Sequence, residues 1–356
     1  MNLTDENLIN LESLRRSIQN KEAYHPLYVK IKLVYTCNLR CVMCKHWRES
    51  RPSPLSGDRF KELIAELAQM GCYKIHFTGG EPLLRRDAVD LVAFANERGI
   101  RVTMTTNGTL VTKELVRSLI QAGLRGVNIS IDSPDRKIHE SIRGVKGSWK
   151  KATRVVQYFR RYAEKGKINV RVNTVVSRLN YHSLTSMPDF AFQLGADSLN
   201  LIGIDDHWTD NLRMRSRDVA FYNQRIAPEI ANRGLELGLF TTEDQAYPFG
   251  HSHETNVYAR KGEYAFGWYQ EHPCYVPWFH SLIDFDGLVY ICCSTREQTP
   301  SLGNLNLNSF SEIWNGPVYH YIRERMQPPR MKQCRRCDDF LTENKVLFNM
   351  LNPDEK

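Results

Sequence analysis

Several features that would place a chain in a broad class are missing from this sequence of 356 residues. There is no run of about 18 apolar residues, which argues against a membrane-spanning helix. Residues 1–20 lack the basic start and apolar stretch of a secretory signal. No block of basic residues is interleaved with aromatics in the way that contacts nucleic acid. These absences predict a cytoplasmic protein that binds neither membrane nor nucleic acid.

Internal repeats and low-complexity tracts are also absent. The hydrophobic fraction of 42% and the charged fraction of 25% are typical of a globular protein. The length is enough for one large domain plus a small one, or for two ordinary domains, and for a sizeable core. The formal net charge is +8, with the basic residues spread along the chain. This charge fits either a solvated basic surface or an acidic partner, such as a phosphorylated or nucleotide-linked substrate.

The chain has nine cysteines, and they are clustered rather than scattered. In a reducing compartment such cysteines seldom form structural disulfides, so their clustering indicates metal sites. Cys72 stands alone, begins a predicted strand and is interpreted as a core residue. The other eight form an early set and a late set: Cys37, Cys41 and Cys44, then Cys274, Cys292, Cys293, Cys334 and Cys337.

Short β-rich runs alternate with helical periods between residues 28 and 204. This alternation predicts a parallel sheet with helices on its outside, either doubly wound or closed into a partial barrel. In both cases ligands bind at the carboxyl ends of the strands. Helices are expected at 56–70, 86–98, 111–121, 148–164 (with Ser148 as its N-cap), 183–194 and 217–236. Strands are expected at 28–36, 73–78, 101–106, 126–131, 169–176 and 197–204.

The early cysteines form the pattern CxxxCxxC directly after the first predicted strand. Thiolates are the ligands of iron–sulfur clusters. Three of them within eight residues can hold a 4Fe–4S cluster and leave one iron open to bind a cofactor or substrate. The alternative is a zinc site, which favours four protein ligands, with His46 as the nearby candidate for the fourth.

This pattern resembles that of the radical S-adenosylmethionine (SAM) superfamily, whose partial barrel of six βα units would decide between the two sheet types. Other matches lie at successive strand ends, although Met43 stands where the family usually has an aromatic residue. The GGEP motif implies a site for the SAM amino group, and the later positions imply contacts with its carboxylate, ribose and adenine. The residues that the resemblance assigns to SAM are Gly79, Gly80, Glu81, Pro82, Asn107, Ser130, Asp132, Arg143, Asn173 and Ile202.

The late cysteines surround a predicted hairpin whose turn is Asp286-Gly287. A zinc ribbon and unrelated buried thiols are the alternatives. The spacing resembles the Twitch domain, a shortened form of the SPASM domain of radical SAM enzymes, which implies an auxiliary 4Fe–4S cluster with no open iron. Its expected ligands are Cys274, Cys292, Cys334 and Cys337.

The expected fold is α/β, a partial (β/α)6 TIM-like barrel followed by a small α+β iron–sulfur domain. An N-terminal helical extension is expected at 1–27 and the radical SAM partial barrel at 28–210. A connecting segment at 211–270 leads to the Twitch/SPASM-like auxiliary cluster domain at 271–345.

The resemblance implies a radical SAM oxidoreductase that cleaves SAM reductively to a 5′-deoxyadenosyl radical, with a flavodoxin- or ferredoxin-type electron donor. The radical would abstract hydrogen from a small, polar, sugar-like molecule: a sugar, an aminocyclitol or a nucleotide sugar. Oxidation of an alcohol through the auxiliary cluster is favoured. The alternatives are an epimerase with Cys293 as hydrogen donor, a sugar-acid decarboxylase, a peptide-modifying maturase, and a non-catalytic metal-binding interaction protein.

Two observations bear on the substrate. The 27 residues before the first strand are too few for the N-terminal peptide-recognition domain that peptide-modifying relatives often carry, which weighs against a leader peptide. Polar and aromatic residues between 205 and 280 suit a substrate with many hydroxyls: Asp205, Asp206, His207, Trp208, His251, His253, Tyr275 and Trp278.

Overall fold

The computed structural model describes residues 8–49, 51, 55–204 and 211–353. Their strands form one sheet of nine, in the order β6-β5-β4-β3-β2-β1-β7-β8-β9. Strands β1 to β6 run parallel, as expected of a partial barrel, and β7 continues the parallel pairing beyond β1. The strands are β1 (Tyr28–Val34), β2 (Lys74–Gly79), β3 (Arg101–Thr106), β4 (Gly126–Ser130), β5 (Asn169–Val176), β6 (Ser198–Gly203), β7 (His280–Ile283), β8 (Leu288–Tyr290) and β9 (Gly303–Asn304).

Strands β1, β3, β5 and β6 bury every second residue. In β1, Val29, Ile31 and Leu33 are completely buried, while Lys30 and Lys32 on the other face keep partial exposure. Since successive strand residues point to opposite faces, the buried set packs against the outer helices and the other set faces the barrel interior. The interior is therefore lined by side chains that solvent and ligands can reach.

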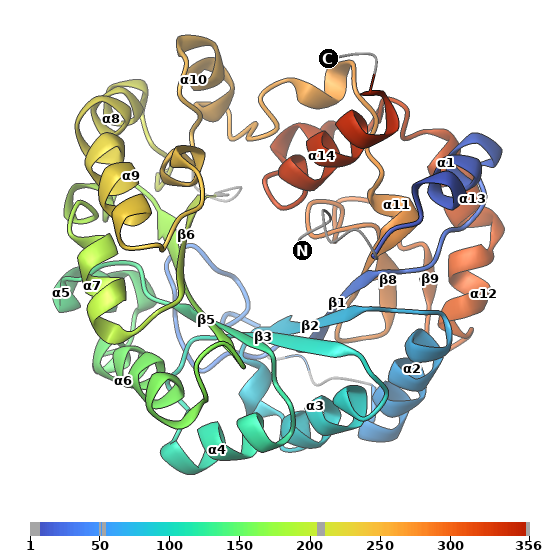
Figure 1. The fold of residues 1–356 in the computed structure, drawn as a ribbon, viewed down its shortest axis with the longest axis horizontal. Coiled ribbons are helices and arrows are strands. Elements are labelled where there is room, and N and C mark those ends of the chain that lie inside the picture. Colours follow the sequence, from blue (N-terminus) through green and yellow to red (C-terminus); the bar gives the residue numbers. More distant parts are fainter. Residues whose placement is uncertain (1–7, 50, 52–54, 205–210, 354–356) are drawn as a thin grey trace.

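The outer helices form an arc around the sheet, and α14 lies on the inner side of that arc (Figure 1). Several begin at a side-chain cap, such as Ser56 before α2 and Thr112 before α4. The helices are α1 (Leu11–Asn20), α2 (Gly57–Gln69), α3 (Ala88–Asn96), α4 (Lys113–Gln121), α5 (Arg136–Arg143), α6 (Ser148–Tyr162), α7 (Met187–Leu194), α8 (Ser216–Phe221), α9 (Ala227–Glu236), α10 (His253–Ala259), α11 (Val276–Phe279), α12 (Phe310–Asn315), α13 (Pro317–Glu324) and α14 (Leu341–Leu351).

Some local predictions need correction. The N-cap of α6 is Gly147, with φ +82°, whereas Ser148 is buried and its hydroxyl has no hydrogen-bond partner. The helix expected at 217–236 is split by a π-helical segment (Tyr222–Ile226) between α8 and α9. Helix α5 was not predicted, because its eight residues are mostly polar and lack a long apolar stripe.

The C-terminal segment is joined to the barrel through backbone pairing. Strand β7 pairs in parallel with β1, from Tyr28 opposite His280 to Ile31 opposite Ile283. The predicted hairpin follows, since β8 pairs antiparallel with β7 and Gly287 occupies the turn at φ +86°. The strand that leads into the early cysteines therefore lies directly beside the hairpin that leads into Cys292 and Cys293.

The N-terminal helix α1 packs near the C-terminal elements, and the indole of Trp278 donates a hydrogen bond to the Ser17 carbonyl, at 3.3 Å. None of the helices in the described ranges combines the length and apolarity needed to cross a bilayer.

Candidate functional site

The three early cysteines lie on the loop that leaves the carboxyl end of β1. The loop is tied to the end of α5: the Arg40 N–H donates to the Arg143 carbonyl at 3.1 Å, and the Val42 N–H to the Ile142 carbonyl at 2.9 Å. Gly144 is needed at this contact, because a Cβ there would lie 2.4 Å from the Arg40 carbonyl oxygen. The loop is thus held in place by backbone pairing.

Each early cysteine has one polar side chain directed at its sulfur. These contacts come from three separate parts of the barrel: the end of β3, the end of α5 and the loop itself. Hydrogen bonds to sulfur stabilise a thiolate and tune an iron–sulfur cluster. The pairs are Asn107 Nδ2 with Cys37 at 3.8 Å, Arg143 Nη1 with Cys41 at 3.8 Å, and His46 Nδ1 with Cys44 at 3.2 Å.

His46 connects this loop to the barrel interior. Its Nε2 lies 3.3 Å from the Lys32 ammonium, which can only donate, so Nε2 is the acceptor. The ring proton therefore lies on Nδ1 and points to the Cys44 sulfur. Burial, with Lys32 nearby, lowers the pKa of His46 to about 2, which keeps the ring neutral. In this arrangement His46 is a hydrogen-bond donor to a cysteine sulfur.

Burial raises the pKa of Cys37 to about 11 and also raises that of Cys41, against the opposing effect of Arg143. A metal that binds Cys37 and Cys41 therefore has to displace the protons of these two thiols. Among the described residues, no group of three Cys, His, Asp or Glu side chains is arranged to hold a single metal ion. A cubane cluster spaces its thiolates more widely, because each binds a different iron.

The two glycines of the GGEP motif lie against the end of β1. A Cβ on Gly80 would lie 2.1 Å from the Thr36 carbonyl oxygen and 2.3 Å from that of Tyr35, and one on Gly79 would lie 2.4 Å from that of Val34. Gly79 also has φ +138°, a conformation that disfavours a side chain. The end of β2 thus packs closely against the backbone that leads into the cysteine loop, and only glycine leaves room for this contact.

Glu81 is fully buried, and both of its carboxylate oxygens accept hydrogen bonds inside the protein. Oε1 accepts from the Thr106 hydroxyl at 2.7 Å and from the Leu83 N–H at 3.2 Å, while Oε2 accepts from the Asn107 N–H at 2.8 Å. Burial raises the pKa of Glu81 to about 7. Glu81 thus joins the end of β2 to the end of β3, and Pro82 beside it is also buried.

Asp132 and Arg143 form a buried, bidentate ion pair at the end of β4. Their two contacts measure 2.6 and 2.8 Å, and Asp132 also accepts from the Val175 N–H at 3.3 Å. The remaining nitrogen, Nη1, faces the Cys41 sulfur. The Asp132–Arg143 pair therefore connects the ends of β4 and β5 to the cysteine loop.

The other residues assigned to SAM lie on the interior face of the next strands. Ser130 pairs with Asn173 in register, and the Asn173 amide oxygen accepts from Asn200 Nδ2 at 3.4 Å. Ile202 lies further along β6, with partial exposure. Beside it, the ring of Tyr264 packs on Gly203, and its hydroxyl donates to the Ile204 carbonyl at 2.6 Å.

The late cysteines converge on a small cavity. Its walls are otherwise mostly apolar, with Val276, Ile291, Met326 and Phe340 among them. Burial, together with the neighbouring sulfurs, raises the pKa of Cys274 well above its ordinary value. Four thiols in one apolar enclosure suit a fully ligated cluster. The four that line it are Cys274, Cys292, Cys334 and Cys337.

Cys293 does not line this cavity. Its side chain is exposed and its sulfur lies 3.3 Å from the Lys30 ammonium on β1. Lys30 is also paired with Asp339, at 2.5 Å. The thiols of two adjacent cysteines thus have different surroundings, one apolar and closed, the other polar and directed at a barrel strand.

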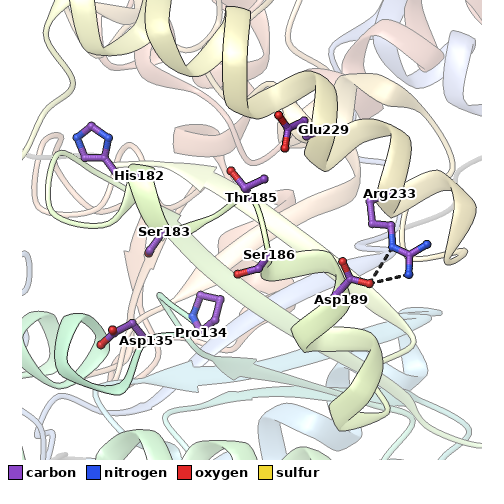
Figure 2. A pocket seen from close by; sticks show the side chains of 9 residues that line it. All are labelled: Pro134, Asp135, His182, Ser183, Thr185, Ser186, Asp189, Glu229 and Arg233. Atoms are coloured by element: carbon purple, nitrogen blue, oxygen red, sulfur yellow. Dashed lines mark hydrogen bonds and ion pairs between the residues drawn. The ribbon is translucent and has the colours of Figure 1, made fainter.

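A pocket of about 570 Å³ lies elsewhere, between α7, α9 and the loop after β4 (Figure 2). His182, Glu229 and the ion pair of Asp189 with Arg233 line it. None of the cysteines and none of the residues assigned to SAM belongs to its lining. It is therefore distinct from the candidate active site.

Of the residues expected to suit a substrate with many hydroxyls, the four that the structure describes do not form a site. Tyr275 and Trp278 are buried in the core, and His251 bonds the Asp244 carboxylate at 2.6 Å while His253 begins α10. Asp205, Asp206, His207 and Trp208 lie outside the described residues.

Sequence reasoning did not identify the cations of the barrel interior. The signal was present in β1, where Lys30 and Lys32 alternate with apolar residues in VKIKL. A charge at every second position of a parallel strand marks the face that is not packed against helices.

Comparison with known proteins identifies two domains in this chain. Residues 31–185 match the radical SAM superfamily, and residues 274–338 match SPASM, an iron–sulfur cluster-binding domain. Among solved structures, that of SuiB from Streptococcus suis superposes with a TM-score of 0.66 at 20% identity, covering 88% of this chain and 71% of SuiB. This likeness concerns the fold.

Two curated relatives match about half of the chain. An AdoMet-dependent heme synthase of Nitratidesulfovibrio vulgaris is 36% identical over 163 residues, 45% of this chain and 43% of its own length. A PqqA peptide cyclase of Rhodopseudomonas palustris is 33% identical over 181 residues, 50% of this chain and 47% of its own length. The matched part thus spans less than half of each relative.

The radical SAM match covers β1 to β5 with the CxxxCxxC and GGEP motifs, and the SPASM match covers all four cysteines of the closed cavity. Domains of these two kinds imply 4Fe–4S clusters and SAM as cofactors. The chain therefore contains a radical SAM domain over residues 31–185 and a C-terminal SPASM iron–sulfur cluster-binding domain over residues 274–338.

Proposed function

We propose that this protein is a radical SAM oxidoreductase that modifies a substrate held against the interior face of its barrel. Cys37, Cys41 and Cys44 would hold the cluster that binds SAM. The four cysteines of the closed cavity would hold an auxiliary cluster. When bound, SAM and the first cluster supply a 5′-deoxyadenosyl radical on reduction, and the auxiliary cluster supplies a site for one electron.

The observation that carries this proposal is the position of β1 between the two cysteine sets. Its carboxyl end leads into Cys37, its register partner β7 begins the hairpin that precedes Cys292, and its Lys30 contacts Asp339, two residues after Cys337. A substrate on the inner face of β1 would therefore lie between both sets. This supports a reaction in which the substrate loses a hydrogen atom on the side of the first cysteine set and then an electron to a cluster on the side of the late set.

The residues of the chain have separate tasks in this reaction. Arg143, fixed by Asp132, would place positive charge beside Cys41, and Asn107 and His46 would support the other two sulfurs. Ser130, Asn173 and Ile202 would line the SAM site along β4 to β6. The apolar walls around the second set would exclude water from the auxiliary cluster.

The proposed substrate is not restricted to a sugar-like molecule. The comparisons do not support a sugar, and the residues that favoured one do not converge as far as the structure describes them. The curated relatives include proteins named for heme synthesis, for cyclisation of a peptide and for maturation of mycofactocin. A peptide substrate is therefore a second candidate, and an aminocyclitol or sugar acid has no specific support.

Epimerisation remains the second candidate reaction, because Cys293 is exposed and its thiol faces Lys30 on the barrel strand. A thiol in that position can donate a hydrogen atom to a substrate radical, after which the product would carry hydrogen from solvent. Cys293→Ala run in deuterated water separates the reactions. An epimerase loses turnover in the variant, and its wild type takes up deuterium, whereas an oxidase does neither.

The experiment that tests the proposal is anaerobic reconstitution followed by reduction in the presence of SAM. About eight irons per chain and formation of 5′-deoxyadenosine are expected, since two 4Fe–4S clusters are proposed. Replacing all three early cysteines by alanine should abolish 5′-deoxyadenosine formation. Replacing Cys334 and Cys337 should leave SAM cleavage but stop substrate oxidation. A reconstituted protein with a single zinc and no SAM cleavage would instead be a metal-binding interaction protein.

A further inference from the structure

The interior face of the barrel sheet is strongly basic. The residues concerned alternate with buried apolar ones along their strands, so they point away from the outer helices. The register supports this, because Tyr28, Lys74 and Arg101 are partners across β1, β2 and β3 and share one face. The basic residues of this face are Lys30, Lys32, Lys74, Arg101 and Arg171.

Lys74 and Arg171 reach into the same interior space. They lie on β2 and β5, which are separated by β3 and β4 in the sheet. Even so, after burial the charge of Arg171 is the largest cause of the lowered pKa of Lys74, ahead of Arg101 and Lys30 on the neighbouring strands. Side chains on strands that do not touch interact in this way when both point into the curve of a barrel.

These cations have few counter-charges. Lys30 is paired with Asp339, and Glu343 on α14 acts on both Lys74 and Arg171. Within the described ranges, Lys32, Lys74, Arg101 and Arg171 form no ion pair with a carboxylate. The nearest stabilising contact of Lys74 is the ring of Tyr28, with its ammonium 4.8 Å from the centroid.

Burial and the surrounding cations lower the pKa of Lys74 to about 8. The positive charge of Lys74 therefore costs free energy at neutral pH, and an anion bound beside the ammonium would offset this cost. Arg171 adds a planar guanidinium, which binds carboxylate and phosphate oxygens in a bidentate manner. Its Nε donates to the Ser198 hydroxyl at 3.2 Å, which orients the group.

From these observations we infer that the substrate carries an oxyanion, a carboxylate or a phosphate, which binds between Lys74, Arg101 and Arg171. The inference rests on the proposed function for the other end of the substrate, where the reacting carbon lies near the cysteine loop. Lys74 begins β2 and Gly79 ends it, so the two ends are separated by roughly 16 Å of strand. The substrate is therefore elongated, with its anionic group toward the amino ends of the strands.

The test uses the reconstituted protein with SAM and two simple anions, inorganic pyrophosphate and citrate, in titration calorimetry at low chloride. Saturable binding of at least one is expected. Lys74→Gln and Arg171→Gln should each weaken it about tenfold or more, and Lys74→Arg and Arg171→Lys should retain most of it. Lys150→Gln, an exposed position on the outer helix α6, is the matched control and should not change it. An iron content equal to that of the wild type shows that each variant is folded and carries its iron–sulfur clusters.

The outcomes are distinct. Binding of pyrophosphate alone assigns the site to phosphate, binding of citrate alone assigns it to carboxylates, and binding of both supports the shared chemistry. No saturable binding, or binding that the two Gln variants leave unchanged, overturns the inference. If the wild type then still forms 5′-deoxyadenosine on reduction, only this inference fails. If it binds anions but does not cleave SAM, the proposed function fails.

Discussion

The ammonium of Lys30 lies 3.3 Å from the thiol of Cys293, so this cysteine faces the barrel strand β1 rather than the closed cavity. Its neighbour Cys292 lines that cavity with the three other late cysteines. The two adjacent residues are therefore expected to respond differently to substitution. Cys292→Ala should lower the iron content of the reconstituted protein from about eight toward about four per chain, while Cys293→Ala should leave it unchanged. Iron and sulfide assays measure this, and the reverse pattern would make Cys293 the ligand.

Asp132→Asn should destabilise the protein strongly. It leaves the buried guanidinium of Arg143 without its carboxylate, which typically costs about 3–5 kcal/mol of unfolding free energy. Asp189→Asn is the control, because its pair with Arg233 is partly exposed and should contribute less than about 1 kcal/mol. Urea unfolding of the three proteins gives the comparison. Similar losses in both variants would show that the buried pair has no special importance.

Gly80→Ala should disrupt the site for the first cluster. The new methyl would lie 2.1 Å from the Thr36 carbonyl oxygen, and backbone cannot move aside as a flexible side chain does. Iron content should fall toward about four per chain, and SAM cleavage should be lost. Gly166→Ala provides the control: its φ of +82° costs about 1–2 kcal/mol, but nothing lies within 4 Å of the added methyl. Equal iron content in both variants would contradict this expectation.

Stability should depend on the charge of Lys74 in a defined pH window. Its pKa is lowered to about 8 in the folded protein, from an ordinary value of 10.5, so the folded state binds fewer protons than the unfolded state between these values. The charged Lys74 therefore destabilises the folded state. This loss of stability is fully present below pH 8 and disappears as the pH rises to 10.5. The groups acting on Lys74 are Arg171, Arg101 and Lys30, with Glu343 opposing them.

Lys74→Met removes this cost. The variant should therefore be more stable than the wild type at pH 7 by about 1–3 kcal/mol, and the difference should shrink as the pH rises through this window. Unfolding by urea at several pH values, compared between the two proteins, cancels the contribution of other groups. A difference in unfolding free energy that is constant with pH would show that the pKa of Lys74 is not lowered in the folded protein.

Much of the architecture is readable from the sequence because it rests on local patterns. Every second residue of β1 is apolar, which predicts a strand with one packed face, and a similar alternation recurs in most of the barrel strands. The CxxxCxxC and GGEP motifs follow the first two strands directly, so the position of the chemistry at the strand ends follows from chain order. The sequence does not predict helix α5, because Ile138 and Ile142 are its only apolar residues and two positions are too few to establish a helical period.

What only the tertiary structure decided are relations between residues that are far apart in sequence. The choice of Cys292 over Cys293 depends on which thiol meets Cys274 and Cys334, and no spacing rule states this. The opposition of Lys74 and Arg171 depends on the curvature of the sheet. A strand pattern shows which face a side chain occupies, but the distance across a barrel is determined by the order and twist of the strands between them.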